Sequence, residues 1–102
     1  MQPYDADKFE RDVRSVLEDI ADLLIDKNKK YGDSALNPQR IFSRASVIEQ
    51  IDVRIDDKLP RIKNMNTNDI EDVKESIADS IRDLVGYLVM REIAKRRQES
   101  DT

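Results

Sequence analysis

The sequence predicts an all-α fold, in which three main helices form an antiparallel bundle that is completed by oligomerisation. Apolar residues recur at helical spacing in three separate stretches of the chain. Charged residues make up 39% of the 102 residues and apolar residues 38%, with two glycines and three prolines, which is typical of helices rather than of a β-sandwich. A chain of this length has a modest core, so we expect helix faces to be buried against further copies, in a dimer or tetramer.

The first helix is expected from Phe9 to about Lys30, after a short lead-in. Asp5 or Asp7 is a suitable N-cap, and Gly32 is a suitable end, because glycine adopts the left-handed conformation that closes many helices. Seven apolar residues form one stripe on this helix: Phe9, Val13, Val16, Leu17, Ile20, Leu23 and Leu24.

The second helix is expected to begin at about Ser43 or Ser46. Pro60 should kink or end it, because proline lacks the amide hydrogen that a helix needs and clashes with the preceding turn. The apolar stripe of this helix consists of Ile48, Ile51, Ile55, Leu59 and Ile62.

The third helix is expected over Ile70–Arg91, capped by Thr67 or Asn68, and it should fray after Arg91 into a charged tail. Its apolar stripe consists of Ile70, Val73, Ile77, Ile81, Leu84 and Leu88. The three helices together predict a single domain over residues 1–102, with flexible ends at about 1–8 and 97–102.

Composition excludes several kinds of chemistry. The net charge of -4 argues against binding to DNA or RNA, because phosphate backbones attract a positive field. The chain has no cysteine and no histidine, so a metal site would use oxygen ligands and hold Mg²⁺ or Mn²⁺. No apolar run approaches the ~20 residues that span a bilayer, so we expect no membrane partner and a cytoplasmic location.

Acidic residues gather beside the stripes of the second and third helices. In an antiparallel pair these edges can face each other, and carboxylates that lie close together repel unless a cation lies between them. A divalent ion there could hold a phosphate chain and activate water. The alternative is that these acids are only solvated. The acids are Glu49, Asp52 and Asp56 on the second helix and Asp72, Asp79 and Asp83 on the third.

Two further groups could bind a nucleotide. Lys27, Asn28, Tyr31 and Ser34 bring a ring, a cation and polar groups together where the first helix ends, a set that could stack a base and contact phosphates. An ordinary interhelical loop is the alternative. Basic residues on the second helix could neutralise phosphate charge, or could form only exposed ion pairs. These basic residues are Arg54, Lys58 and Arg61.

Three stretches resemble a family of phage and bacterial proteins called nucleotide modification associated domain 1: KNKKYGDS (27–34), RIDDKLPRI (54–62) and the run from Asp79 to Tyr87. The layout is also similar to that of MazG-like all-α nucleoside triphosphate pyrophosphatases, which carry E-x-x-E on one helix and E-x-x-D on the next. This sequence departs from that pattern. Its first motif ends in Asp52, and its second has the spacing Glu75-x-x-x-Asp79-x-x-x-Asp83.

The resemblance implies an Mg²⁺-dependent pyrophosphohydrolase that cleaves an NTP or dNTP to the monophosphate and pyrophosphate. Glu49, Asp52, Asp79 and Asp83 would then hold the metal, and Glu49 or Asp56 would orient the attacking water. Phosphates would be held by Lys27, Arg54 and Lys58, and the base by Tyr31 or Tyr87. A protein that binds or sequesters a nucleotide without cleaving it is a second hypothesis, motivated by the imperfect acidic motif. A purely structural helical oligomer is the third.

Overall fold

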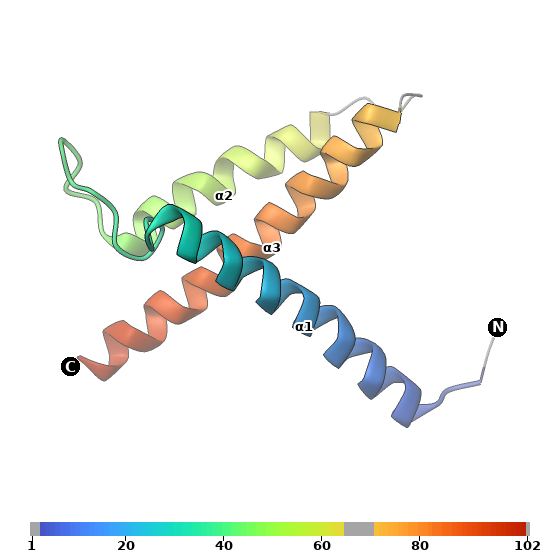
Figure 1. The fold of residues 1–102 in the computed structure, drawn as a ribbon. Helices are drawn as coiled ribbons and strands as arrows, with labels where there is room; N and C mark the ends of the chain where they lie inside the picture. Colours follow the sequence, from blue (N-terminus) through green and yellow to red (C-terminus); the bar gives the residue numbers. More distant parts are fainter. Residues whose placement is uncertain (1–2, 65–70, 102) are drawn as a thin grey trace. The chain divides into compact units, whose positions relative to one another are not determined.

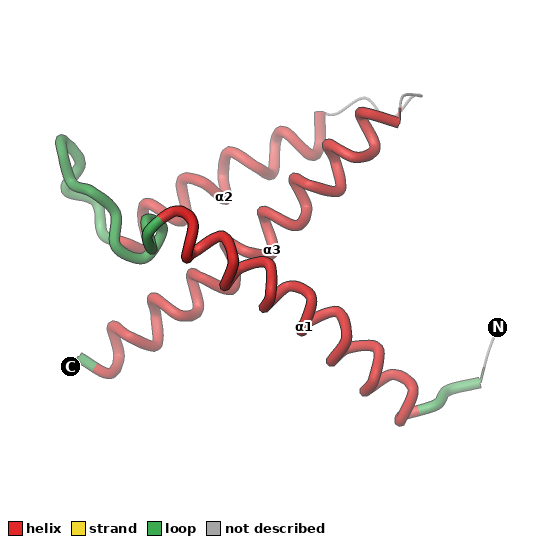
Figure 2. The backbone as a smooth tube through the Cα atoms, in the orientation of Figure 1, coloured by secondary structure: helices red, strands yellow, loops and turns green. Residues whose placement is uncertain are grey.

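The computed structural model describes residues 3–64 and 71–101, and the side chains of 3–64 and 77–101. Within these residues the structure is all-helical, with three helices and no strand, which confirms the predicted fold class. Figure 1 and Figure 2 show the helices α1 (Ala6–Tyr31), α2 (Val47–Asn64) and α3 (Glu71–Ser100). The chain divides into two compact units, Met1–Gly32 and Asp33–Thr102.

The first unit consists of α1, which begins three residues before the expected Phe9 but has caps that the sequence predicts. The Asp5 carboxylate accepts a hydrogen bond from the backbone N–H of Lys8, at 3.1 Å, and caps the helix start. Gly32 ends the helix in the left-handed conformation, with a φ of 67°, and its N–H donates to the carbonyl of Asn28. A lone helix has no neighbour within its own unit, and no residue of α1 is buried.

The second unit is built on an antiparallel pair, in which α2 packs against α3. Ile51 is the most completely buried large side chain among the described residues, at 1% exposure. Small residues of α3 complete the core, with Ser80 at 3% and Ala94 at 8% exposure, and Gly86 is buried as well. Small side chains allow the two helix backbones to approach each other closely.

Ser46 caps the start of α2. Ser46 Oγ accepts a hydrogen bond from the backbone N–H of Glu49 at 3.1 Å, and the Ser46 hydroxyl donates to a carboxylate oxygen of Glu49 at 3.2 Å. Ser46 is therefore the cap, which confirms one of the two predicted starts. The sequence signal is S-x-x-E, in which the residue at the third helical position folds back onto the cap.

Two helix ends differ from the predictions. Of the two effects expected of Pro60, a kink or an end, the end is wrong, because α2 continues to Asn64. Pro60 is exposed, so water can hydrate the carbonyl that lacks an N–H partner one turn earlier. The third helix does not fray after Arg91 but continues to Ser100, through residues that mostly favour helices. An Arg96–Glu92 pair at 3.1 Å lies on this extension. The predicted caps Thr67 and Asn68, and Ile70, lie outside the described residues.

The face of α3 that meets α2 also differs from the prediction. Ile81 and Leu88, in the predicted stripe, are 45% and 50% exposed, whereas Ser80 is buried. Asp83 and Tyr87, which the sequence places with Ser80 beside the stripe, are partly buried. The helix is therefore turned so that this mixed polar edge packs on α2, because its small residues allow close packing there.

Candidate functional site

Among the side chains that the structure describes, two ion pairs join α2 to α3. Arg91 Nε donates to Asp52 Oδ1 at 2.6 Å, and Arg91 Nη2 donates to Asp52 Oδ2 at 3.3 Å, which is a two-pronged arginine–carboxylate contact. Lys58 Nζ lies 3.3 Å from Asp83 Oδ2. Because the α2 residue number rises between the two pairs while the α3 number falls, these pairs also fix the antiparallel register.

The two pairs lie on opposite edges of the α2–α3 contact. At ~100° per residue, Asp52 and Lys58 are ~120° apart around the axis of α2. The buried side chain of Ile51 lies between them in this projection. Arg91 and Asp83 are likewise separated around α3, by ~80°. We name the two sides the Lys58 edge and the Asp52 edge.

The Lys58 edge combines acids and bases. Arg54 lies one turn before Lys58 on α2, and Arg61 follows about one turn later; both are exposed. On α3, one turn in each direction from Asp83 leads to Asp79 and Tyr87. Antiparallel counting therefore places Arg54 near Tyr87 and Arg61 near Asp79, on either side of the Lys58–Asp83 pair. Asp79 is also paired with Arg82 of its own helix, at 3.3 Å.

The Asp52 edge holds the other predicted acids. Glu49 and Asp56 lie with Asp52 on this side of α2, and both are exposed. Glu49 is engaged by Ser46 in the cap, and Asp52 by Arg91. The hydrogen bond from Arg91 holds the pKa of Asp52 below its ordinary value of 3.8, and the same contact raises the pKa of Arg91.

The structure thus divides the four predicted metal ligands into two sets. Asp79 and Asp83 belong to the Lys58 edge, and Glu49 and Asp52 to the Asp52 edge. In the described part of the chain, no group of three or more acidic side chains could hold a metal ion. The side chains of Asp72 and Glu75 lie outside that part.

The predicted nucleotide-binding residues are also divided, between the two units. Lys27, Asn28 and Tyr31 belong to the last turns of α1, where Tyr31 is 69% exposed, and Ser34 follows in the turn after Gly32. Arg54, Lys58 and Tyr87 belong to the second unit and gather on the Lys58 edge.

Sequence reasoning missed Arg91 and the capping role of Glu49. The S-x-x-E pattern at Ser46–Glu49 could have revealed the cap. Asp52 and Arg91 are 39 residues apart, and their ion pair depends on the register between α2 and α3. No local sequence pattern therefore predicts it.

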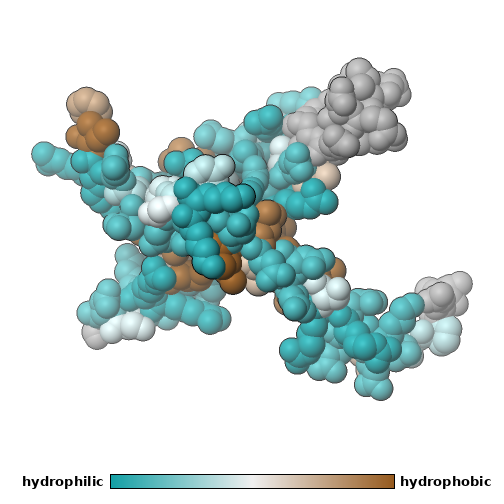
Figure 3. Space-filling view, in the orientation of Figure 1, coloured by the Kyte–Doolittle hydropathy of each residue, from teal (hydrophilic) through white to brown (hydrophobic). Residues whose placement is uncertain are grey.

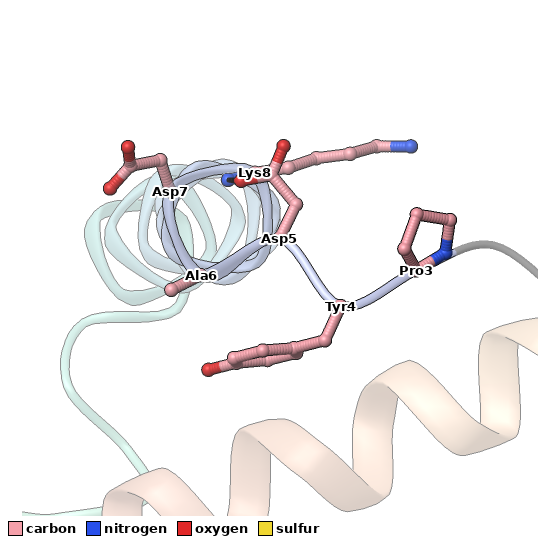
Figure 4. A pocket seen from close by; sticks show the side chains of 6 residues that line it. All are labelled: Pro3, Tyr4, Asp5, Ala6, Asp7 and Lys8. Atoms are coloured by element: carbon pink, nitrogen blue, oxygen red, sulfur yellow. Dashed lines mark hydrogen bonds between the residues drawn. The ribbon is translucent and has the colours of Figure 1, made fainter.

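A hollow at the start of α1 is lined by six consecutive residues, Pro3 to Lys8 (Figure 4). It surrounds the Asp5 cap and contains none of the predicted site residues. None of the described helices has an apolar stretch long enough to span a bilayer.

The fold and the Lys58 edge define an all-helical protein with a charged seam between two antiparallel helices. Residues 27–94 match the family described as nucleotide modification associated domain 1. The match covers more than half of the chain, which therefore belongs to this family. It includes α2, most of α3 and the last turns of α1, but not the first part of α1. No curated protein and no solved structure matches the chain.

Proposed function

We propose that this protein binds a nucleotide with Mg²⁺, through the phosphate groups, at the Lys58 edge of the α2–α3 pair. The observation that carries the proposal is the Lys58–Asp83 pair, which places a cation for phosphate and a carboxylate for a metal ion 3.3 Å apart. The family described as nucleotide modification associated domain 1 supports a nucleotide as the ligand.

The chemistry of this edge suits a magnesium–phosphate complex. Mg²⁺ is usually bound by one or two carboxylates together with substrate phosphates and water, rather than by a cage of protein ligands. Asp79 and Asp83, one helical turn apart, can supply those carboxylates. Arg54, Lys58 and Arg61 can neutralise the remaining phosphate charge, and Tyr87 offers a ring against the base. Manganese, with similar ligand preferences, is the alternative metal.

The Lys58–Asp83 pair would open when the complex binds. The Lys58 ammonium group would then contact a phosphate, and the Asp83 carboxylate would contact the metal ion. Each group would thus replace one oppositely charged partner with another. Lys58 and Asp83 are only 21% and 33% exposed, so separating them without new partners is unfavourable. Metal and phosphate should therefore bind cooperatively, each improving the affinity of the other.

Pyrophosphohydrolysis of an NTP or dNTP is the specific reaction that we propose for this site, because its products follow from water attacking a metal-bound phosphate chain. Binding without cleavage is the second candidate. It is favoured because Glu49 and Asp56, the predicted water-orienting groups, lie on the Asp52 edge. We also propose that the protein acts as a cytoplasmic homo-oligomer.

The experiment is a panel of NTPs and dNTPs, tested with and without Mg²⁺ for thermal stabilisation and for release of pyrophosphate. Asp83→Asn and Arg54→Ala should each weaken Mg²⁺-dependent nucleotide binding about tenfold or more, since each removes a charge-assisted contact. Asp57→Asn is a matched control, because Asp57 is an exposed acid of α2. Loss of pyrophosphate release in Asp56→Asn with binding preserved would identify an enzyme that also uses the Asp52 edge.

The outcomes separate the hypotheses. Stabilisation together with pyrophosphate release supports the hydrolase. Stabilisation without release supports a nucleotide-binding protein. Equal behaviour of Asp83→Asn and Asp57→Asn would contradict the Lys58 edge as the site, whatever the overall activity.

A further inference from the structure

The loop between α1 and α2 presents two apolar side chains to solvent. Ile41 is 76% exposed and Phe42 is 96% exposed, and Arg40 and Arg44 stand on either side of them. Figure 3 shows apolar atoms at the tip of this loop, beyond a hydrophilic base. Ile41 and Phe42 together form an apolar patch, and such patches with a polar rim are typical of surfaces that bind another surface.

Hydrogen bonds hold this loop, so its tip is displayed in an ordered form. The Arg40 guanidinium donates to the carbonyl of Ala45, and the Gln50 side-chain amide donates to the same oxygen at 2.9 Å. The backbone N–H of Ala45 donates to Ser43 Oγ at 3.1 Å. Residues 40–45, which we name the 40–45 loop, are thereby closed on themselves and anchored to α2. A preorganised apolar tip costs little entropy to dock.

A complementary surface exists on α1. Five of its seven apolar residues follow alternating steps of four and three residues, and Leu17 and Leu24 adjoin them. Phe9, Val16 and Leu17 are 62%, 58% and 54% exposed. We name these seven residues, from Phe9 to Leu24, the α1 stripe. Asp12 and Asp19 lie along one flank of the stripe, at about 75–95° from its centre. The α1 stripe is thus apolar with an acidic rim, and the 40–45 loop is apolar with a basic rim.

We propose that the 40–45 loop of one copy docks on the α1 stripe of a second copy, and that the two copies make this contact reciprocally in a two-fold dimer. Two complementary patches on one chain either close into a two-fold pair or continue head to tail, and the two-fold pair is by far the commonest arrangement of homo-oligomers. Phe42 is the central anchor, and Arg44 faces the acidic rim. This proposal does not depend on nucleotide binding, and its test is separate.

Two other occupants fit the charges less well. An antiparallel pair of α1 helices would bring the acidic flanks of both copies together, which is repulsive. A membrane surface with anionic lipids would repel the same flank, whereas membrane-binding amphipathic helices carry basic residues there. The basic rim of the 40–45 loop therefore complements the acidic rim of the α1 stripe better than either of these surfaces does.

The test is the oligomeric state of the full chain, measured by sedimentation equilibrium. Phe42→Ser and Val16→Asp should each weaken dimerisation about tenfold or more, as truncation of a central anchor does. Val53→Ser is the matched control, because Val53 is 58% exposed on α2 and lies outside both patches, so this variant should remain dimeric. Circular dichroism confirms that each variant keeps its helices.

Mixing the variants tests reciprocity. A dimer of Phe42→Ser chains, or of Val16→Asp chains, has both contacts broken. A mixed dimer keeps one intact contact, between the loop of the Val16→Asp chain and the stripe of the Phe42→Ser chain. Mixed dimers should therefore form more tightly than either variant alone. Arg44→Glu should weaken the dimer, and adding Asp12→Lys and Asp19→Lys should restore it. A monomeric wild-type chain, or a dimer that Phe42→Ser leaves unchanged, would overturn the proposal.

Discussion

Asp52 and Arg91, 39 residues apart in the chain, meet in a two-pronged ion pair whose shorter contact is 2.6 Å. The pair connects the first half of α2 with the second half of α3, and both side chains remain about two-fifths exposed. It fixes the register of the helix pair from one edge, as Lys58 and Asp83 do from the other.

The stability contributed by the Asp52–Arg91 pair should depend on pH. The pKa of Asp52 is lower in the folded protein than its ordinary value of 3.8, so the unfolded chain binds this proton more readily. The contribution is full above pH 3.8 and is lost as the pH falls through the folded-state pKa. Urea unfolding at several pH values should show Asp52→Asn less stable than wild type at pH 7, with the difference shrinking as the pH falls below 3.8.

Asp57→Asn is the control for this titration, since Asp57 is an exposed acid of the same helix. It should follow the wild-type curve throughout. A difference between wild type and Asp52→Asn that persists unchanged at the lowest pH would show that the effect does not come from the ionised pair.

Lys58→Met tests the coupling of metal and phosphate at the Lys58 edge. The variant keeps the length of the side chain and removes its charge, which leaves Asp83 without this partner. We expect Mg²⁺ alone to bind the variant more tightly than wild type, because the carboxylate no longer has to release the ammonium group. Mg²⁺–pyrophosphate should bind more weakly, by about tenfold. Isothermal titration calorimetry with both probes measures the two effects, and a change of the same sign in both would contradict the exchange of partners.

The sequence predicts the helices of this protein well because local signals define them. Asp5 and Gly32 cap α1 where their residue types indicate, and the stripe of α2 contains Ile51, the most buried large side chain among those described. The prediction that Pro60 could end α2 is wrong because an exposed helix face tolerates a missing N–H, whose carbonyl partner water can hydrate. The charged residues after Arg91 continue α3 instead of fraying, because most of these residue types favour helices.

The candidate site is less predictable, because it depends on how one helix is turned against another. Periodicity places Ile81 and Leu88 on the buried face of α3, yet α2 packs beside that face, on Ser80 and Ala94. A rotation of this kind decides which acids share an edge. It separates Asp83 from Asp52, and nothing in a single sequence specifies it.

Glu49 offers a clear test between a capping role and a metal-binding role. In the structure its backbone N–H donates to the Ser46 hydroxyl that caps α2, and its carboxylate accepts from the same hydroxyl. Ser46→Ala should destabilise the protein by about 1 kcal/mol, through loss of the cap. Glu49→Gln should cost less, because glutamine at this position can still make the cap hydrogen bond. If Glu49 caps α2 and binds no metal, Glu49→Gln should leave Mg²⁺-dependent nucleotide binding unchanged, as measured by thermal shift. A large loss of that binding in Glu49→Gln would indicate that Glu49 binds the metal ion.

Pro60→Ala should stabilise the protein, because α2 continues through this position to Asn64. Alanine restores the N–H that the carbonyl of Asp56 lacks, removes the clash of the proline ring, and has the highest helix propensity. Proline restricts the unfolded chain, so folding of the proline protein loses less conformational entropy, and this offsets part of the gain from alanine. We expect a net increase of about 1–2 kcal/mol in the free energy of unfolding in urea. Leu59→Ala, at the neighbouring half-exposed position, is a control for local composition and should not stabilise. A decrease in stability for Pro60→Ala would mean that the proline conformation is required by the packing of α2 on α3.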